Sequence, residues 1–177
     1  DLIFVFSAAN NMLGHKGAKI LAEMLSVSTS MKKLNVLSNS IGDEGYEMLT
    51  TVAEEKAILT LVGFDEGQTE ADLSKKRLEP IDAKLIAREL TTGFVSSSMT
   101  LLNLAYNRLT FNAGSYEFDD MSGVKAIADA LSVSTSMKKI KLNECELPID
   151  VLKTEVEVDL SGQELGVEDA IIIAACI

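Results

Sequence analysis

One nine-residue string occurs twice in the chain and restricts its possible folds more than any other feature. The sequence LSVSTSMKK occupies residues 25–33 and returns unchanged at residues 131–139. Nine identical residues do not recur by chance in a chain of 177. Part of the chain is therefore built from copies of one unit, and such units bury their apolar faces against their neighbours.

Each copy of the unit opens with an alternating pattern of apolar residues. Residues 34–41 read L-x-V-x-x-N-x-I, and alternation with period two predicts a short strand. The same frame starts at seven places, which are Phe6, Leu34, Val62, Ala71, Leu102, Ile140 and Val158. An asparagine amide both donates and accepts hydrogen bonds, so Asn11, Asn39 and Asn107 are predicted to bridge neighbouring units.

A second pattern, with helical spacing, follows five of the copies. It consists of a Gly or Asp, an aliphatic residue four positions later and another apolar residue four positions beyond that. The five copies begin at Gly17, Gly45, Asp82, Gly123 and Asp169. Spacings of three and four predict one buried face of a helix. We therefore expect five helices, the last of which buries Ile173, Ala174 and Ile177.

A short strand and a helix of about three turns cannot bury their apolar faces alone. Stacked units would align their strands in a parallel sheet, with the helices on its outer side. A helix is about 10 Å wide and neighbouring strands are about 4.8 Å apart, so such a stack curves. The sequence predicts an α/β fold: a right-handed, horseshoe-shaped solenoid of about seven turns, irregular in places. Short parallel strands would line its concave face, and helices its convex face.

The repeated pattern resembles that of a known family. Met31, Leu34, Val36, Asn39 and Ile41 follow L-x-x-L-x-L-x-x-N/C-x-L on a unit near 28 residues, which resembles the leucine-rich repeat of the ribonuclease-inhibitor-like class. The resemblance implies a single leucine-rich-repeat domain over residues 1–177. We expect it to be a fragment of a longer array, since neither end has a polar cap. Repeat regions of NOD-like receptors, the Ran GTPase-activating protein and tropomodulin share this class, so it does not fix a function.

Three places depart from the regular unit. The interval from Val62 to Ala71 is 9 residues and that from Ile140 to Val158 is 18, so neither has room for a full helix. About ten extra residues lie around Thr110 to Ser122, where we expect a bulging loop.

Composition excludes several classes of function. The net charge is −11, from 16 basic and 27 acidic residues, which disfavours binding to nucleic acid or to an anionic membrane. No apolar run reaches the roughly 18 residues of a membrane span. One histidine and two cysteines cannot form a four-ligand zinc site, and no phosphate- or dinucleotide-binding motif occurs. We expect a cytoplasmic, non-enzymatic protein without cofactor or metal.

Exposed strand positions and the inserted loop are the candidate partner-binding surfaces. Convergent side chains on a rigid sheet suit protein docking, although a solvated face without a partner is the alternative. The candidates from the strands and their ends are Asn35, Leu37, Asp65, Asp72, Asn103, Tyr106, Lys141, Asn143 and Asp159. Those from the loop are Tyr116, Phe118, Asp119 and Asp120, which combine aromatic rings with charges.

The function expected is that of a protein-interaction scaffold with a partner protein of unknown identity. The segment from Asn143 onward contains nine acidic residues and one lysine, so its net charge is −8. This excess of negative charge favours a basic partner. One alternative is a regulator like the Ran GTPase-activating protein, in which Arg108 and Asn107 would stabilise charge. A second alternative is structural assembly, by end-to-end self-association through the uncapped termini.

Overall fold

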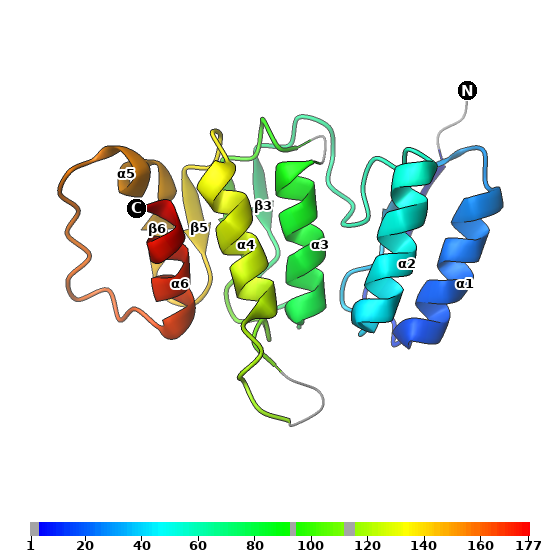
Figure 1. The fold of residues 1–177 in the computed structure, drawn as a ribbon, viewed down its shortest axis with the longest axis horizontal. Coiled ribbons are helices and arrows are strands. Elements are labelled where there is room, and N and C mark those ends of the chain that lie inside the picture. Colours follow the sequence, from blue (N-terminus) through cyan, green and yellow to red (C-terminus); the bar gives the residue numbers. More distant parts are fainter. Residues whose placement is uncertain (1–3, 93–94, 112–115) are drawn as a thin grey trace. The chain divides into compact units, whose positions relative to one another are not determined.

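The computed structural model describes residues 4–92, 95–111 and 116–177, and within these residues it contains six helices and six strands. The chain divides into two compact units, Asp1–Phe64 and Asp65–Ile177 (Figure 1). Each unit combines one small sheet with helices. The expectation of a single domain stays a prediction.

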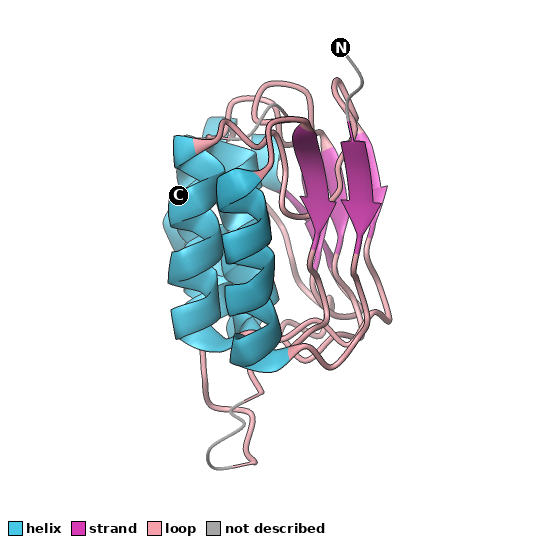
Figure 2. Cartoon of the chain, turned by 90° about the vertical axis from the view of Figure 1, so that its right-hand side faces the viewer, coloured by secondary structure: helices cyan, strands magenta, loops and turns pink. Residues whose placement is uncertain are grey.

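The first unit alternates strands and helices. Its elements are β1 (Phe4–Ser7), α1 (Gly14–Val27), β2 (Met31–Asn35) and α2 (Gly42–Glu55). β1 and β2 pair in parallel, and a parallel bridge from Lys33 to Thr60 continues the pairing beyond β2. In Figure 2 the two helices stand in one layer and the two strands in another. The core between the layers contains Leu34, Leu25 and Leu49, which are fully buried.

The second unit contains the larger sheet. Its elements are β3 (Glu70–Asp72), α3 (Pro80–Thr91), β4 (Leu101–Asn103), α4 (Ser122–Val133), β5 (Lys139–Lys141), β6 (Glu146–Pro148), α5 (Ile149–Thr154) and α6 (Val167–Cys176). The strand order is β3-β4-β5-β6. The first three strands are parallel, and β6 is antiparallel to β5. α4 packs against both α3 and α6 (Figure 1).

One row of side chains joins this sheet to its core. Ala71, Leu102, Ile140 and Leu147 lie opposite one another in the strand register, and all four are buried. Each of the three larger side chains of this row, Leu102, Ile140 and Leu147, contributes about 1.5–3 kcal/mol through the removal of apolar surface from water. Because successive residues of a strand point to opposite faces, the neighbouring positions lie on the other, exposed face.

The prediction of a continuous seven-turn leucine-rich-repeat solenoid is wrong, although the α/β class is right. The strands form two separate sheets of two and four strands, and one strand pair is antiparallel. Only four residues separate β5 from β6, a connection too short for a parallel crossover, so the chain returns as a hairpin. The repeat pattern predicts instead that this stretch continues in parallel toward a strand at residues 158–160.

Two of the seven expected strands do not form. Residues 62–64 are irregular: Gly63 has φ +87°, and the Asn35 side chain approaches it so closely that a Cβ would lie 2.9 Å from the amide nitrogen. Residues 158–160 are also without regular structure, because β6 and α5 occupy the 18-residue interval before them. The expected inward position of Phe6 is wrong too: as part of an edge strand, its side chain is 45% exposed.

The helix prediction is confirmed at all five sites, by α1, α2, α3, α4 and α6. In α6, however, the predicted face is wrong by one position. Ile172 and Cys176 are buried, whereas Ile173 is half-buried and Ile177 is exposed. Every residue of α6 except Glu168 and Asp169 is apolar, so the spacing alone allowed more than one buried face.

Asn39 bridges two segments of the first unit, as predicted. Its side-chain nitrogen donates to the carbonyl oxygens of Ala8 and Val36, at 2.8 and 2.9 Å, and its oxygen accepts from the Asn11 N–H at 3.0 Å. Asn39 is buried, so these bonds replace water for groups that would otherwise be unsatisfied. Asn11 itself does not bridge units, since its amide donates only within its own segment.

Asn107 does the same in the second unit. Its nitrogen donates to the carbonyls of Leu73 and Leu104, both at 2.8 Å. Its oxygen accepts from the N–H groups of Lys76 and Leu78, at 2.9 and 3.0 Å. The bridging role predicted for Asn39 and Asn107 is confirmed.

Candidate functional site

The exposed side of the four-stranded sheet brings several predicted residues together. Asp72, Asn103, Lys141 and Glu146 lie opposite one another in the register, one from each strand. We call this row, together with Lys75, Tyr106 and Glu144, the sheet face. Along the row the charge runs negative, neutral, positive, negative. This offers a partner hydrogen-bonding groups of both signs on a rigid support.

The adjacent strand position carries an ion pair. The Lys139 ammonium lies 2.8 Å from a carboxylate oxygen of Glu146, and this hydrogen bond raises the pKa of the lysine. Both side chains are about half exposed, so the pair adds little stability. It does fix the position of Glu146 at the edge of the sheet face.

Tyr106 is the largest side chain of the sheet face, and it is 53% exposed. Its hydroxyl donates to a carboxylate oxygen of Glu144 at 2.7 Å, and this bond raises the pKa of the tyrosine. The Lys75 ammonium lies 5.1 Å from the centre of its ring, within the range of a cation–π interaction. Lys75 follows β3, Tyr106 follows β4 and Glu144 follows β5, so these contacts connect the carboxyl ends of three strands.

Four of the predicted docking residues have a local structural role. The side-chain oxygens of Asn35, Asp72, Asn103 and Asp159 each accept the N–H of the residue two positions on, at 2.9–3.1 Å. Asn and Asp favour this turn, which lies at the ends of β2, β3 and β4 and, for Asp159, in an irregular segment. Hydrogen bonds from the Ser74 hydroxyl and N–H lower the pKa of Asp72, and hydrogen bonds from the Ser161 N–H and hydroxyl lower the pKa of Asp159.

Other predicted residues lie outside the sheet face. Asn35 belongs to β2 of the first unit, where it pairs with Ser7. Leu37 is only 4% exposed and belongs to the core. Asp65 and Asp159 lie in irregular segments, and both are exposed.

The inserted loop between β4 and α4 carries a cluster of aromatic rings. The centre of the Phe111 ring lies 6.4 Å from that of Tyr116 and 5.4 Å from that of Phe118. The Arg108 guanidinium lies 5.8 Å from the Phe111 ring. Tyr116 and Phe118 are both exposed. Residues 112–115 of the predicted loop lie outside the described residues.

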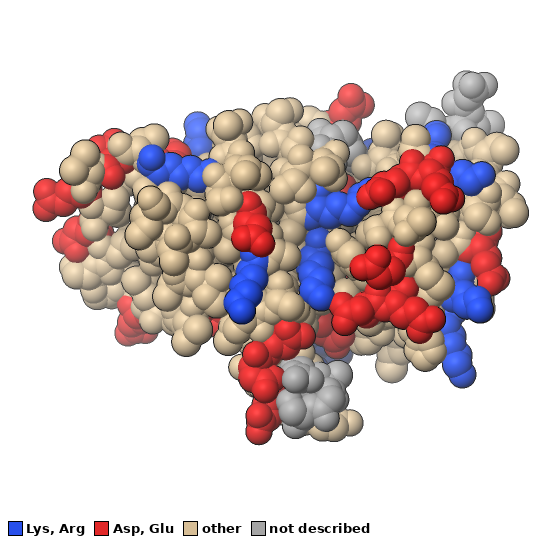
Figure 3. Space-filling view, viewed as in Figure 1, with Lys and Arg blue, Asp and Glu red and all other residues tan. Residues whose placement is uncertain are grey.

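Acidic side chains surround these rings. Asp119 is exposed, and Asp120 accepts the Ser122 N–H at 2.9 Å, which places it just before α4. Figure 3 shows acidic side chains along the loop that projects below α4. Both predicted features of the loop, aromatic rings and negative charge, are therefore present on its described residues.

A pocket of about 340 Å³ lies beneath this loop. We call it the loop pocket. It is lined by Asn107, Leu109, Thr110, Phe118, Met121, Leu142, Asn143, Val167 and Glu168. These residues come from the segments after β4 and β5 and from the first turn of α6. Ligand sites of α/β proteins often lie in this position, beyond the carboxyl ends of parallel strands. Sequence reasoning named Asn107, Phe118 and Asn143 as candidates, but it reached Thr110 only as the start of the inserted loop and Glu168 only as one of nine acidic residues. No pattern joins these residues into one site.

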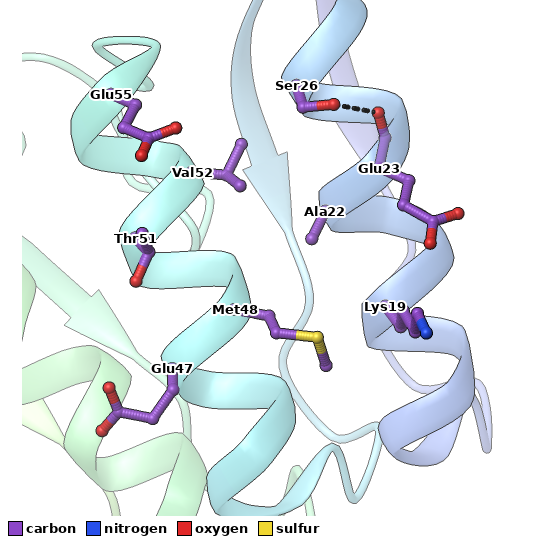
Figure 4. A pocket seen from close by; sticks show the side chains of 9 residues that line it. All are labelled: Lys19, Ala22, Glu23, Ser26, Glu47, Met48, Thr51, Val52 and Glu55. Atoms are coloured by element: carbon purple, nitrogen blue, oxygen red, sulfur yellow. Dashed lines mark hydrogen bonds between the residues drawn. The ribbon is translucent and has the colours of Figure 1, made fainter.

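A second hollow, of about 440 Å³, lies between α1 and α2. Figure 4 shows Ala22 of α1 facing Met48 and Val52 of α2, with Glu23 and Glu47 on the outer sides of the helices. Figure 3 shows acidic side chains gathered over these two helices. The helical pattern predicted which faces of α1 and α2 are buried in the core. It gave no reason to expect a hollow between the two helices.

The two residues suggested for a GTPase regulator, Asn107 and Arg108, make contacts within the protein itself. The Asn107 amide is fully engaged by the backbone groups described above, so it is not available to a nucleotide. The Arg108 side chain lies against Phe111. These contacts do not support the regulatory alternative.

Both cysteines are buried and free. Burial raises the pKa of each thiol, so neither resembles an activated nucleophile. The Cys145 sulfur lies 3.8 Å from the side-chain oxygen of Gln163. Among the residues that the structure describes, no group of three His, Cys, Asp or Glu side chains could hold a metal ion.

Within the described ranges, none of the helices combines the length and apolar character needed to cross a membrane. Comparison of the sequence with models of protein families gives no match, and comparison with curated proteins gives none either. The resemblance to leucine-rich repeats therefore rests on the motif alone, and membership of that family stays a prediction.

Proposed function

We propose that this chain is a protein-interaction module, and that it binds a partner protein on the sheet face of the second unit. The observation that carries the proposal is the alignment of Asp72, Asn103, Lys141 and Glu146 in one row opposite the buried one; Asp72 and Glu146 are exposed, and Asn103 and Lys141 are half-buried. The opposite row is buried, so the strands cannot turn these side chains away from solvent. A partner would meet groups already fixed in place, which lowers the entropic cost of binding.

Tyr106 supports the proposal. Tyrosine is enriched at protein interfaces, because its ring offers a large apolar surface while its hydroxyl bonds a polar group. Here the hydroxyl donates to Glu144 and the ring is contacted by Lys75, so two contacts hold the side chain although it is half exposed. An ordered, exposed aromatic residue beside charged groups is the arrangement of an interface anchor.

Photocrosslinking from two matched lysine positions tests the proposal. Lys141 lies on the sheet face, whereas Lys125 is exposed on α4. A photoreactive amino acid replaces each lysine in turn, and covalent adducts are identified by mass spectrometry after irradiation of living cells that produce the protein. We expect one protein to be trapped from position 141 and not from position 125, and Tyr106→Ser to reduce its capture. Adducts from position 125 alone, or no effect of Tyr106→Ser, would refute docking on the sheet face.

Structural assembly is a second candidate, which one observation favours. Phe4, Val5 and Phe6 of β1 are all exposed, on a strand that pairs on one side only within the described residues. Such an edge can pair with the same strand of a second copy. Light scattering over a range of concentrations would then show dimers, and Phe6→Ser would reduce them. A constant monomer mass for the unmodified chain would eliminate this candidate.

A further inference from the structure

The loop pocket contains polar side chains that the protein itself does not satisfy. Thr110 lines the pocket and is only 5% exposed, and its hydroxyl, which bonds to no other described residue, is still reached by solvent. The Asn143 amide and the Glu168 carboxylate line the same pocket, and no hydrogen bond or ion pair with another described residue engages either of them. Polar groups that lack a protein partner must bond to water or to a ligand.

Apart from Asn107, whose amide is engaged by backbone groups, the remaining walls of the pocket are apolar. Leu109, Met121, Leu142 and Val167 form them, and the Phe118 ring stands at one side. The volume of about 340 Å³ is at the lower end of the range for small-ligand sites, roughly 300–1,000 Å³. The pocket therefore suits one long side chain better than a folded element. A side chain with an apolar stem and a polar head would match both kinds of wall.

The polar groups of the pocket favour a cationic head. Glu168 is negative, and the side-chain oxygens of Thr110 and Asn143 can accept hydrogen bonds. Asp119 and Asp120 of the loop add further negative charge nearby, while the neighbouring cation, Arg108, lies against Phe111. The surroundings thus provide acceptors and negative charge for an incoming group rich in donors.

Arginine fits these surroundings better than lysine. Its guanidinium presents five donors in a planar fork, stacks on aromatic rings and is weakly hydrated, so it loses less on entering a pocket. The three acceptors come from three different segments of the chain and line one pocket, which favours a planar group with several donors. A lysine ammonium is compact and strongly hydrated.

We infer that the loop pocket receives an arginine side chain of the partner, a contact that rests on the proposed function and names the chemistry the partner must supply. Asn143 connects the two surfaces in sequence. It lines the pocket, and the next residue, Glu144, accepts the hydroxyl of Tyr106 on the sheet face. An extended basic segment on the sheet face can therefore place one side chain in the pocket.

Peptide titration followed by NMR tests the inference without a known partner. The probes are acetyl-Gly-Gly-X-Gly-Gly-amide peptides in which X is arginine, lysine or citrulline; citrulline has nearly the same shape as arginine without the charge. We expect the arginine peptide to shift the backbone amide signals of Thr110, Asn143 and Glu168 in a saturable way. Citrulline should bind about tenfold more weakly, because the charge-assisted hydrogen bonds are lost, and lysine should lie between the two. Equal binding of arginine and citrulline, or shifts confined to other parts of the chain, would overturn the inference.

Two glutamate variants test whether the Glu168 carboxylate binds the arginine peptide. Glu168→Gln removes the charge in the pocket and should weaken the arginine peptide about tenfold. Glu164→Gln removes an exposed charge that does not line the pocket, and it should leave binding unchanged. Equal affinity of Glu168→Gln and the unmodified chain would refute the role of Glu168.

The same variants separate this inference from the proposed function. If Glu168→Gln leaves both peptide binding and partner capture from position 141 at full strength, the pocket inference is wrong while docking on the sheet face stands. If the arginine peptide binds the pocket but position 141 captures no protein, the sheet-face proposal fails. The pocket then remains an arginine site.

Discussion

The two copies of LSVSTSMKK place the same nine residues in two different surroundings. In both, a helix ends at the third residue of the string, and a serine hydroxyl accepts a backbone N–H three residues on. The distance is 3.1 Å from Ser28 to Met31 and 3.2 Å from Ser134 to Met137. The helix end and the turn are therefore properties of the local sequence.

Beyond this turn the two copies differ. In the first unit Met31 is half-buried and already begins β2, whereas in the second unit Met137 is only 3% exposed and β5 begins two residues later. The second copy has an additional neighbour, since the Lys153 ammonium of α5 donates to the carbonyls of Leu131 and Ser134. Tertiary contacts therefore determine the burial and the strand boundary, and the local sequence does not.

The largest expected effect is a loss of stability when the bridging asparagine of each unit, Asn39 or Asn107, is replaced by alanine. Asn39→Ala would leave several buried backbone groups unsatisfied, at a cost of about 3 kcal/mol in the free energy of unfolding. Asn107→Ala should cost about 2 kcal/mol, because Asn107 is half-buried and water can replace part of what is lost. Urea unfolding of both variants measures the difference. Asn11→Ala, at an exposed position, is the control, and a cost for Asn39→Ala no larger than the control would contradict the assignment.

The two methionines of the repeated string should differ as well. Met137→Ala creates a cavity in the core and should destabilise the chain by about 2.5 kcal/mol. Met31→Ala should cost about 1 kcal/mol, since part of that side chain is already in water. Thermal and urea unfolding provide the comparison. Equal losses would show that the identical sequences have equivalent surroundings after all.

Removal of the additional neighbour tests why the second copy differs. Lys153→Met keeps the apolar stem of the side chain but loses the bonds to two carbonyls at the end of α4, at a cost of about 1 kcal/mol. Lys125→Met, an exposed change on α4, should be neutral within experimental error. If the two variants were equally stable, Lys153 would have no role in holding the second copy.

The smallest expected effect is a pH dependence that comes from Asp72 of the second unit. Asn35 and Asp72 make the same turn, but only the carboxylate titrates. Hydrogen bonds from Ser74 lower the pKa of Asp72 in the folded chain, so its stabilising contribution is complete above the pKa of the unfolded chain and is lost as the pH falls through the folded value. Asp72→Asn should flatten this part of the acid dependence of stability. A profile unchanged by the substitution would show that Asp72 does not contribute to it.

The sequence predicted the features that depend on local spacing. The helices, the turn-forming residues and the bridges of Asn39 and Asn107 follow from residue types at fixed intervals, and the structure contains them. The antiparallel strand β6 was missed, because the four-residue connection after β5 breaks a pattern assumed to be continuous. The buried face of α6 was also missed, since a helix rich in apolar residues has no single amphipathic phase.

The candidate site was predictable to a smaller extent. Asp72, Asn103 and Lys141 share a strand position, so their alignment follows once parallel pairing is assumed. The loop pocket could not be predicted, because Thr110, Asn143 and Glu168 are brought together by tertiary packing of three segments distant in sequence. Leu37 was misjudged as exposed because the residues after β2 turn into the core.

Hydrogen exchange of the chain, with and without the protein captured from position 141, tests the central claim most directly. Docking on the sheet face predicts slower exchange in residues 72–75, 101–106 and 139–144, and no change in residues 31–35 of the first unit. Slower exchange confined to α1 and α2, with residues 101–106 and 139–144 unaffected, would contradict the account.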